Sequence, residues 1–336
     1  MLILDAATPD KIDALGRLTA LLEADLQATN QAIVARMDSP VALIPQLAAH
    51  IVAAGGKRMR PLLTLAAAKL CGYQGQRHVK LAACVEFIHT ATLLHDDVVD
   101  ESLLRRGFAS ANALFGNKAS VLVGDFLFAR SFELMVEDGS LEVLRILCAA
   151  SATIAEGEVL QLTTQNDIST TSETYFEVIK GKTAALFAAA AEVGGVIAGA
   201  SAPDCAALQS FGMDLGMAFQ LVDDALDYAA SQAELGKTVG DDFREGKLTY
   251  PVILALAEAT DEERAFWTRT LEHSEQTEED LATALALMAK YDVTARTIAK
   301  ADEFIDRAIA TLARFEPSEI REALAGVARY TTARRH

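Results

Sequence analysis

The 336-residue sequence is poor in proline and cysteine, with seven and four residues, and it has a single tryptophan. The cysteines lack the spacing of a metal site and lie in apolar segments, so we interpret them as reduced thiols and expect a cytoplasmic protein. Basic residues are also in the minority, because 30 Lys and Arg against 47 Asp and Glu give a net charge of −17. No basic stripe is present to follow a phosphate backbone, which argues against nucleic-acid binding.

Long hydrophobic runs are missing as well. The longest, Ala184 to Ala191, ends at Glu192, far short of the roughly 20 apolar residues that cross a bilayer. The first ten residues lack the basic and then apolar layout of a secretory signal. We therefore expect no transmembrane segment and no export.

Strand signals are equally scarce, since no alternating apolar and polar run flanked by hairpin turns stands out. Apolar residues instead recur at three- and four-residue steps from Ile12 to Leu26, the pattern of one buried helical face. Comparable patterns predict helices over 9–37, 41–54, 61–71, 77–102, 118–137, 140–163, 173–200, 204–231, 247–259, 262–272, 278–290, 292–314 and 317–333. No linker divides the chain, so we expect an all-α fold, a large helical bundle that forms one domain over residues 1–336.

Three aspartates near the end of one predicted helix, Asp96, Asp97 and Asp100, form the first candidate site. On a helix, Asp96 and Asp100 lie about 40° apart and roughly 6 Å apart along the axis, so they can hold the same ligand. Oxygen-only ligands suit Mg²⁺, which keeps some of its waters and bridges to phosphate. A solvated acidic helix end is the alternative for this motif by itself.

The same spacing recurs at Asp223, Asp224 and Asp227, after a second apolar helical run. If the two helices face each other across a cavity, six carboxylates can hold several Mg²⁺ ions around one diphosphate. Such an arrangement neutralises the diphosphate and activates it as a leaving group. The repeated motif therefore predicts diphosphate chemistry.

Basic residues are grouped as phosphate ligands would require. One group lies in Gly55-Gly56-Lys57-Arg58-Met59-Arg60-Pro61, a second is Arg105-Arg106, and Lys182, Lys237 and Lys247 each follow a glycine. Arginine forks and lysine point charges are well matched to diphosphate oxygens. Two alternatives remain open: a basic turn after a glycine-ended helix for the first group, and surface partners of Glu101 for the second.

Taken together, these motifs resemble the trans-isoprenyl diphosphate synthase family. The stretch Phe87 to Glu101, followed by Arg105-Arg106-Gly107, is most similar to its long-chain, octaprenyl-forming type. The resemblance covers nearly the whole chain and implies an all-α prenyltransferase homodimer with two or three Mg²⁺ ions in a central cavity. It also implies repeated condensation of isopentenyl diphosphate onto an allylic diphosphate such as farnesyl diphosphate. The product would be handed to the membrane as a quinone side chain.

The family's functional residues carry over to matching positions of this sequence. Those for isopentenyl diphosphate are Lys57, Arg60, His89 and Arg106; those for the allylic diphosphate are Arg105, Lys182, Thr183, Gln220, Lys237 and Lys247. The implied metal ligands are Asp96, Asp100, Asp223 and Asp227, with Asp97 and Asp224 completing the catalytic set. By themselves, His89 would be a satisfied core histidine and Gln220 a buried amide with its own hydrogen bonds.

Product length is expected to depend on residues deeper along the first aspartate helix. Ala91 and Thr92 precede Asp96 by five and four residues, and both are small. In short-chain relatives a bulky aromatic commonly occupies one of these positions, so the resemblance implies an open tunnel, with Ile88 on the same face and Met135 near its floor. The alternative is that the small residues only allow tight helix packing.

Other classes of protein compete with this interpretation. A geranylgeranyl or farnesyl diphosphate synthase would share the motifs, and so would a non-catalytic partner subunit of a synthase. A terpene cyclase needs no second diphosphate site and usually carries Asn and Ser in its second metal motif. A di-iron bundle needs two Glu-x-x-His pairs, whereas Glu86-Phe87-Ile88-His89 is the one such pair that the sequence offers.

Overall fold

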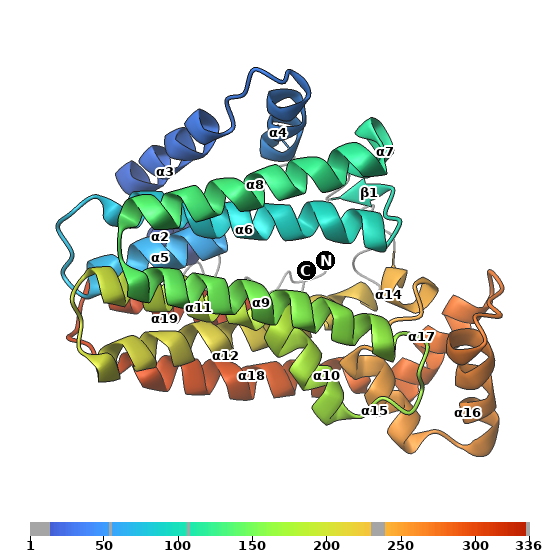
Figure 1. The fold of residues 1–336 in the computed structure, drawn as a ribbon. Helices are drawn as coiled ribbons and strands as arrows, with labels where there is room; N and C mark the ends of the chain where they lie inside the picture. The colour runs from blue at the N-terminus through green and yellow to red at the C-terminus, as the bar shows by residue number, and fades with distance from the viewer. Residues whose placement is uncertain (1–13, 54–55, 106–107, 230–238, 334–336) are drawn as a thin grey trace, which may run out of the picture.

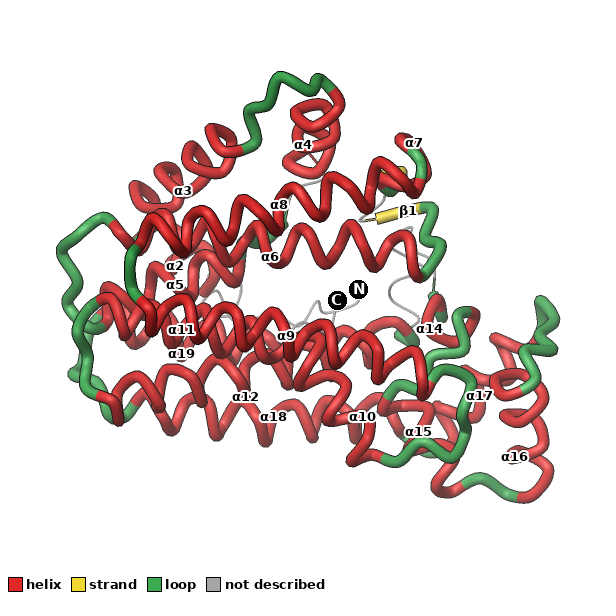
Figure 2. The backbone as a smooth tube through the Cα atoms, in the orientation of Figure 1, coloured by secondary structure: helices red, strands yellow, loops and turns green. Residues whose placement is uncertain are grey.

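The structure is a computed structural model that describes residues 14–53, 56–105, 108–229 and 239–333 (Figure 1). Its α-helices are α2 (Ala14–Leu21), α3 (Glu23–Arg36), α4 (Leu43–Ala53), α5 (Met59–Leu70), α6 (Arg77–Val99), α7 (Ala111–Phe115), α8 (Asn117–Asp138), α9 (Leu141–Thr164), α10 (Ser172–Ile179), α11 (Ala185–Ile197), α12 (Ala202–Asp227), α14 (Asp241–Arg244), α15 (Tyr250–Glu258), α16 (Asp261–Trp267), α17 (Asp280–Lys290), α18 (Val293–Leu312) and α19 (Glu319–Ala333). Two π-helical turns, η1 (Lys180–Ala184) and η2 (Thr268–Glu272), follow α10 and α16. The prediction of an all-α fold is confirmed, as Figure 2 shows.

Several predicted boundaries were wrong for local reasons. The described part of the predicted helix 9–37 is divided at Leu22, and the predicted helix 173–200 is interrupted by η1. The short helices α7 and α14 were not predicted, because four or five residues carry too little periodicity to be recognised. A two-residue hairpin was also missed: β1 (Leu104–Arg105) pairs antiparallel with β2 (Phe108–Ala109).

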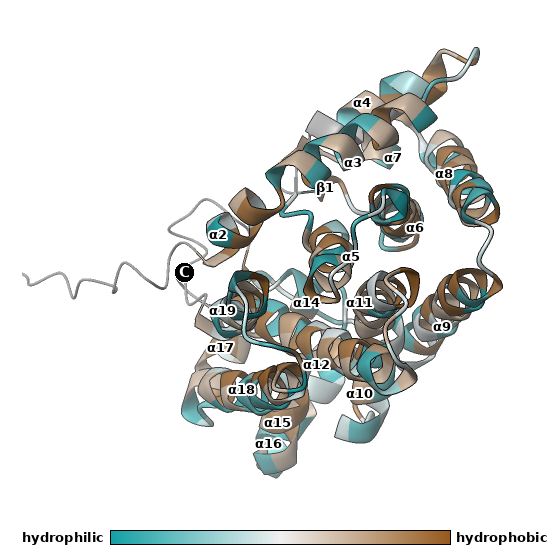
Figure 3. Ribbon diagram, turned by 90° about the vertical axis from the view of Figure 1, so that its left-hand side faces the viewer, coloured by the Kyte–Doolittle hydropathy of each residue, from teal (hydrophilic) through white to brown (hydrophobic). Residues whose placement is uncertain are grey.

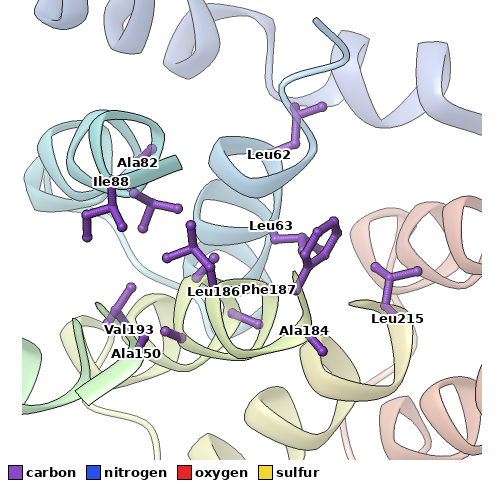
Figure 4. Close-up of a cluster of buried hydrophobic side chains, with 14 of the residues drawn as sticks. Leu62, Leu63, Ala82, Ile88, Ala150, Ala184, Leu186, Phe187, Val193 and Leu215 are labelled. Carbon is purple, nitrogen blue, oxygen red and sulfur yellow. The ribbon is translucent and has the colours of Figure 1, made fainter. Parts of the chain in front are cut away.

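Helix α11 is the centre of the main core. Almost every side chain along it is buried, as expected for a helix surrounded by protein, and it packs against α5, α6, α9 and α12. Figure 4 shows side chains from these helices, among them Leu63, Leu186 and Phe187, meeting in one cluster. Close approach of α11 and α12 requires glycine, because a Cβ on Gly212 would lie 2.3 Å from the carbonyl oxygen of Phe187.

The helices lie in layers that bring two helix ends to the same end of the bundle. Viewed end-on (Figure 3), α6 lies between α5 and α8, and α12 lies beyond α11. In Figure 1, β1 and α14, which follow α6 and α12 along the chain, both lie at the right-hand end of the bundle. The C-terminal ends of α6 and α12 therefore open onto a common region, and these ends carry the aspartates.

Helices α14 to α17 surround a smaller hydrophobic cluster that includes Trp267 and Phe243. This cluster supports the segment 245–249, which returns to the main bundle. Our expectation of a single domain over residues 1–336 stays a prediction. Within the described part of the chain, none of the helices combines the length and apolar character that a membrane crossing requires.

Candidate active site

Both aspartate clusters lie where a helix disfavours negative charge. Asp96 and Asp97 are in the last turn of α6 and Asp100 caps its C-terminus, while Asp223 to Asp227 end α12. A helix C-terminus carries a partial negative charge, so carboxylates there are destabilising unless a positive partner compensates them. Neither helix has a basic residue in its last turn, so compensation has to come from elsewhere in the structure or from a ligand.

The central aspartate of the first cluster is used by the protein itself. Asp97 is 2% exposed, and its carboxylate accepts a hydrogen bond of 2.6 Å from Nε of Arg105. Its carbonyl oxygen accepts the side-chain amide of Asn112 at 2.9 Å. Arg105 was predicted to bind the allylic diphosphate; the structure pairs it with Asp97, and its role toward the substrate stays a prediction.

The central aspartate of the second cluster has an equivalent role. Asp224 is 4% exposed and accepts hydrogen bonds from the Tyr175 hydroxyl at 2.6 Å and the Gln220 amide at 2.7 Å. Burial raises the pKa of Asp224 to about 7, and both hydrogen bonds oppose this rise. Asp97 and Asp224 thus anchor their clusters, and the outer aspartates are less buried.

The outer aspartates face groups from distant parts of the chain. Asp100 accepts a hydrogen bond of 3.0 Å from Nζ of Lys247, which joins α6 to the segment after α14. Asp227 accepts the backbone N–H of Asp242 at 3.1 Å. Asp223 is exposed, and Asp96 is half-buried.

Electrostatics show that this region is overloaded with negative charge. Burial raises the pKa of Asp96, which Lys182 counteracts and Asp100 reinforces. Burial and the neighbouring Asp96 raise the pKa of Glu158 to about 7. Burial, with a further contribution from Asp241, raises the pKa of Asp227 to about 6. A bound cation would relieve this mutual repulsion.

Lys182 is delivered by an unusual helix geometry. It lies in η1, and π-helical turns are rare and frequently mark functional sites. A Cβ on Gly157 of α9 would lie 2.6 Å from the backbone nitrogen of Lys182, so a glycine is needed for this approach. Nζ of Lys182 then pairs with Glu158 of α9 at 2.7 Å.

The predicted ligands Thr183 and Gln220 form a hydrogen-bonded chain with Asp224. The Thr183 hydroxyl donates to Oε1 of Gln220 at 2.7 Å, and the Gln220 amide donates to Asp224. Gln220 makes these internal hydrogen bonds and also lines the pocket described below, and its role toward the allylic diphosphate stays a prediction. The chain fixes Thr183 beside Lys182 in the wall of the site.

A pocket with about 630 Å³ of empty space, part of it open to solvent, lies beside the second aspartate cluster and extends from Lys182 to Lys247. It is lined by Gln161, Thr164, Gln165, Thr170, Tyr175, Val178, Ile179, Lys182, Thr183, Gln220, Asp224, Asp242, Lys247, Leu248 and Thr249. The residues come from α9, the loop between α9 and α10, α10, η1, α12 and the segment around α14. This pocket brings together five of the residues that the sequence predicted, Lys182, Thr183, Gln220, Asp224 and Lys247, while the other aspartates of the two clusters do not line it.

The basic residues predicted for the second diphosphate form a separate group. Nη1 of Arg60 lies 3.0 Å from Nε2 of His89, and the Arg60 guanidinium stacks 4.4 Å from the centre of the Phe187 ring. Lys57 lies 6.0 Å from the centre of the Tyr330 ring. His89 precedes Asp96 by seven residues, which places the two on the same face of α6 about 10.5 Å apart along the axis.

Two predicted ligands, Arg106 and Lys237, lie outside the described residues. The chain-length residues are described but do not line the pocket. Ala91, Ile88 and Met135 are at most 1% exposed and belong to the main core, and the Thr92 hydroxyl donates to the carbonyl oxygen of His89 at 2.8 Å. Their role in product length stays a prediction.

Sequence reasoning missed four polar residues of this region. Glu158 and Tyr175 belong to no motif that the sequence analysis recognised. Asp242, in Gly240-Asp241-Asp242, could have been noticed because it precedes Gly246-Lys247, and burial next to Asp224 raises its pKa well above the usual range. Glu86 was considered only as half of an iron-binding pair, whereas the structure pairs it with Arg58.

The donor set fits a divalent cation that shares its ligands with phosphate. In the part of the chain that the structure describes, no three His, Cys, Asp or Glu side chains are grouped closely enough to hold a metal ion. Mg²⁺ typically takes one or two carboxylates and completes its shell with water and substrate phosphates. The outer aspartates are not clustered into a closed metal site, but their negative charges repel each other, which agrees with an ion that binds a few carboxylates together with water and phosphate.

Comparison with known proteins gives a consistent result. Residues 41–288 match the family described as Polyprenyl synthetase. The chain is 48% identical to an octaprenyl diphosphate synthase from Escherichia coli strain K12, over 94% of this chain and 97% of that protein. It is 40% identical to an all-trans-nonaprenyl-diphosphate synthase from Rhodobacter capsulatus, over 95% of this chain and 97% of that protein.

Solved structures agree in fold over almost the whole length. The crystal structure of a decaprenyl diphosphate synthase from Rhodobacter capsulatus has a TM-score of 0.92 and 54% identity, covering 95% of this chain and 99% of that chain. A polyprenyl synthase from Caulobacter crescentus CB15, solved with calcium and isoprenyl diphosphate, also has a TM-score of 0.92, with 52% identity over 96% of this chain and 98% of that chain. From its aspartate clusters to its fold, this chain belongs to the polyprenyl synthetase family.

Proposed function

We propose that this protein is a long-chain all-trans-polyprenyl diphosphate synthase, which condenses isopentenyl diphosphate repeatedly onto an allylic diphosphate such as farnesyl diphosphate. The observation that carries the proposal is that Lys247 pairs with Asp100 of the first aspartate cluster and lines one pocket with Lys182 and Asp224 of the second. The octaprenyl, nonaprenyl and decaprenyl synthases among its relatives favour a long product over the geranylgeranyl or farnesyl alternatives. Both acidic clusters are intact, which argues against a non-catalytic subunit.

Magnesium is part of this proposal. Asp96, Asp100, Asp223 and Asp227 would hold two or three Mg²⁺ ions, which supply charge neutralisation of the diphosphate when they are bound. The calcium and isoprenyl diphosphate in the Caulobacter crescentus relative support a divalent cation beside a diphosphate. The allylic diphosphate would be held by Arg105, Lys182, Thr183, Gln220 and Lys247, and by Lys237 outside the described residues.

The remaining basic residues would place the second substrate. Lys57, Arg60 and His89 would bind the diphosphate of isopentenyl diphosphate two helical turns from Asp96, with Arg106 adding to them. The carbon–oxygen bond of the allylic substrate then breaks, and its electron pair leaves with the diphosphate held by the lysines. The double bond of isopentenyl diphosphate attacks the allylic carbon, and we assign the lost proton to the released diphosphate.

Product sizing tests this proposed function. The purified protein is incubated with farnesyl diphosphate, isopentenyl diphosphate and Mg²⁺, and the dephosphorylated products are separated by chromatography. We expect long polyprenols in the presence of Mg²⁺ and no product when EDTA is added. Products that stop at four isoprene units or fewer, or no product at all with Mg²⁺ present, would overturn it.

Replacing the two lysines should separate the two substrate sites. We expect Lys57→Ala to raise the KM for isopentenyl diphosphate by about tenfold or more, and Lys182→Ala to raise the KM for farnesyl diphosphate similarly, because a charge-assisted hydrogen bond contributes about 1.5–3 kcal/mol. Steady-state kinetics with each substrate varied in turn measures both constants. An indistinguishable effect of both variants on both substrates would reject the division.

A homodimer is supported by exposed apolar side chains on α8 and α9. Leu122 and Val136 of α8 are 67% and 69% exposed, and Leu141, Val159 and Leu162 of α9 are 82%, 61% and 53% exposed. Together they form an apolar surface on adjoining helices, and such surfaces mark protein interfaces. We propose that a second copy of the chain covers it.

The double variant Leu122→Asp with Val136→Asp tests the dimer. Two charges in an apolar interface carry a large desolvation cost, so the molar mass from light scattering should fall to that of the monomer. Ala282→Asp, which changes an exposed residue of α17, should leave the mass unchanged. A dimeric double variant would exclude this surface as the interface.

The proposal also includes the location of the protein, the use of its product and its domain organisation. A cytoplasmic location agrees with the four cysteines, none of which forms a disulfide. Use of the product as a quinone side chain, and its transfer to the membrane, rest on the family resemblance. Residues 1–336 are proposed to act as one domain, as the match of relatives over 94% of the chain supports.

A further inference from the structure

The turn that presents Lys57 and Arg60, residues 56–60, contains a strained residue. Arg58 has φ 49° and ψ 35°, the left-handed helical conformation, and it directly precedes α5. A side chain with a Cβ is disfavoured in this conformation, and such residues persist only when their surroundings hold them. Arg58 therefore needs a contact that keeps it in place.

That contact is an ion pair with Glu86. The Arg58 guanidinium pairs with the Glu86 carboxylate on α6, and the two side chains are 18% and 10% exposed. A buried pair is poor evidence for stability, because removing two charges from water offsets their attraction. The pair does fix the orientation of Arg58 relative to α6, since an arginine fork and a carboxylate must align.

The pair lies beside the residues assigned to isopentenyl diphosphate. Glu86 precedes His89 by three residues and so lies on the same face of α6, and Nη1 of Arg60 lies 3.0 Å from Nε2 of His89. The turn is thus joined to α6 twice, by Arg58 to Glu86 and by Arg60 to His89. With its carboxylate neutralised by Arg58, Glu86 also presents no free negative charge to an incoming diphosphate.

We propose that Arg58 and Glu86 are positioning residues, whose ion pair holds the turn 56–60 against α6 so that Lys57 and Arg60 converge on the diphosphate of isopentenyl diphosphate. Neither residue touches the substrate. This inference rests on the proposed function and adds two residues to it.

Three variants test the pair: Glu86→Gln, Arg58→Ala and Arg58→Gly. Glycine adopts the left-handed conformation without strain, so Arg58→Gly removes the ion pair while permitting the backbone geometry. We expect each variant to raise the KM for isopentenyl diphosphate roughly 10-fold, since small displacements of binding groups are costly. The KM for farnesyl diphosphate should stay within about twofold of the wild type, because its ligands lie on other elements.

The double variant Arg58→Ala with Glu86→Gln should be no worse than either single variant, as expected for residues that act through one contact. A matched control is Arg77→Ala, which breaks an ion pair of 2.7 Å to the buried Asp138 side chain at the N-terminal end of α6, nine residues before Glu86. It should leave both KM values unchanged.

Each outcome bears on the inference. A normal KM for isopentenyl diphosphate in Arg58→Gly would mean that the ion pair only maintains the backbone conformation. Equal rises in the KM values for both substrates would mean that the pair has a general structural role. Either result overturns the proposed positioning role. Circular dichroism and thermal unfolding identify variants that fail to fold. If such variants are found, Arg58→Lys, which keeps the positive charge, must retain part of the wild-type affinity for isopentenyl diphosphate. A wild type without condensation activity would instead refute the proposed function.

Discussion

Asp96→Ala and Asp223→Ala should each lower turnover by about 1,000-fold or more while the helical content stays that of the wild type. One aspartate comes from each cluster, and each is placed to share a divalent cation with the departing diphosphate. A factor of 1,000 corresponds to about 4 kcal/mol of lost transition-state stabilisation, within what a metal contributes to such a leaving group. Single-turnover rates at several Mg²⁺ concentrations measure the effect.

The same variants should not destabilise the fold. Both carboxylates lie at helix C-termini among other negative charges, so their removal relieves repulsion and the melting temperature should stay level or rise. Asp97→Ala should differ, because it leaves Arg105 without its buried partner and so lowers the melting temperature. Asp302→Ala, on the exposed face of α18, is the control for loss of one surface carboxylate. Near-normal turnover of either Asp96→Ala or Asp223→Ala at ordinary Mg²⁺ would refute the metal assignment.

Ala91→Phe should shorten the product sharply. Ala91 lies five residues before Asp96, about 7.5 Å along α6, and it is fully buried between helices of the main core. A phenylalanine ring at this depth would block a growing tail that leaves the diphosphate site along α6. Product chromatography after incubation with farnesyl diphosphate and isopentenyl diphosphate gives the chain-length distribution.

Overpacking of the core is the effect to separate from blockage of a tunnel. Inserting a large ring into a packed interior typically costs about 1–3 kcal/mol wherever it is placed. Ala82→Phe serves as the control, because Ala82 is equally buried and lies nine residues from Ala91, on the opposite face of α6. It should lower the melting temperature without shortening the product. Wild-type chain lengths from Ala91→Phe would show that Ala91 does not line the tunnel.

The chemistry of the site could be predicted from a few short motifs. Charged residues are unexpected in apolar helical runs and directly after glycines. The sequence places charges there in the aspartate clusters, in the segment Lys57 to Arg60 and at Lys182. Violations of this kind concentrate at functional sites, because nothing local compensates them. Their spacing was enough to predict a diphosphate site and a divalent cation.

The division of labour within the clusters could not be predicted. Each cluster offers three aspartates in a row of five residues, yet Asp97 and Asp224 turn inward to Arg105, Tyr175 and Gln220. Tyr175 is 49 residues away from Asp224 along the chain. Which carboxylate is buried depends on the helices that pack around it. The position of an aspartate within its motif does not contain that information.

By itself, the sequence determined most of the longer helices and the residue types of the site, because helical periodicity and motif spacing are local properties of the chain. Only the tertiary structure decided which of these residues meet. Lys247 reaches Asp100 across 147 residues, Lys182 reaches Glu158 through a π-helical turn and a glycine contact, and Arg58 reaches Glu86 from a strained turn. Such contacts form when whole helices pack against each other, so they depend on the fold of the entire chain and not on any single segment.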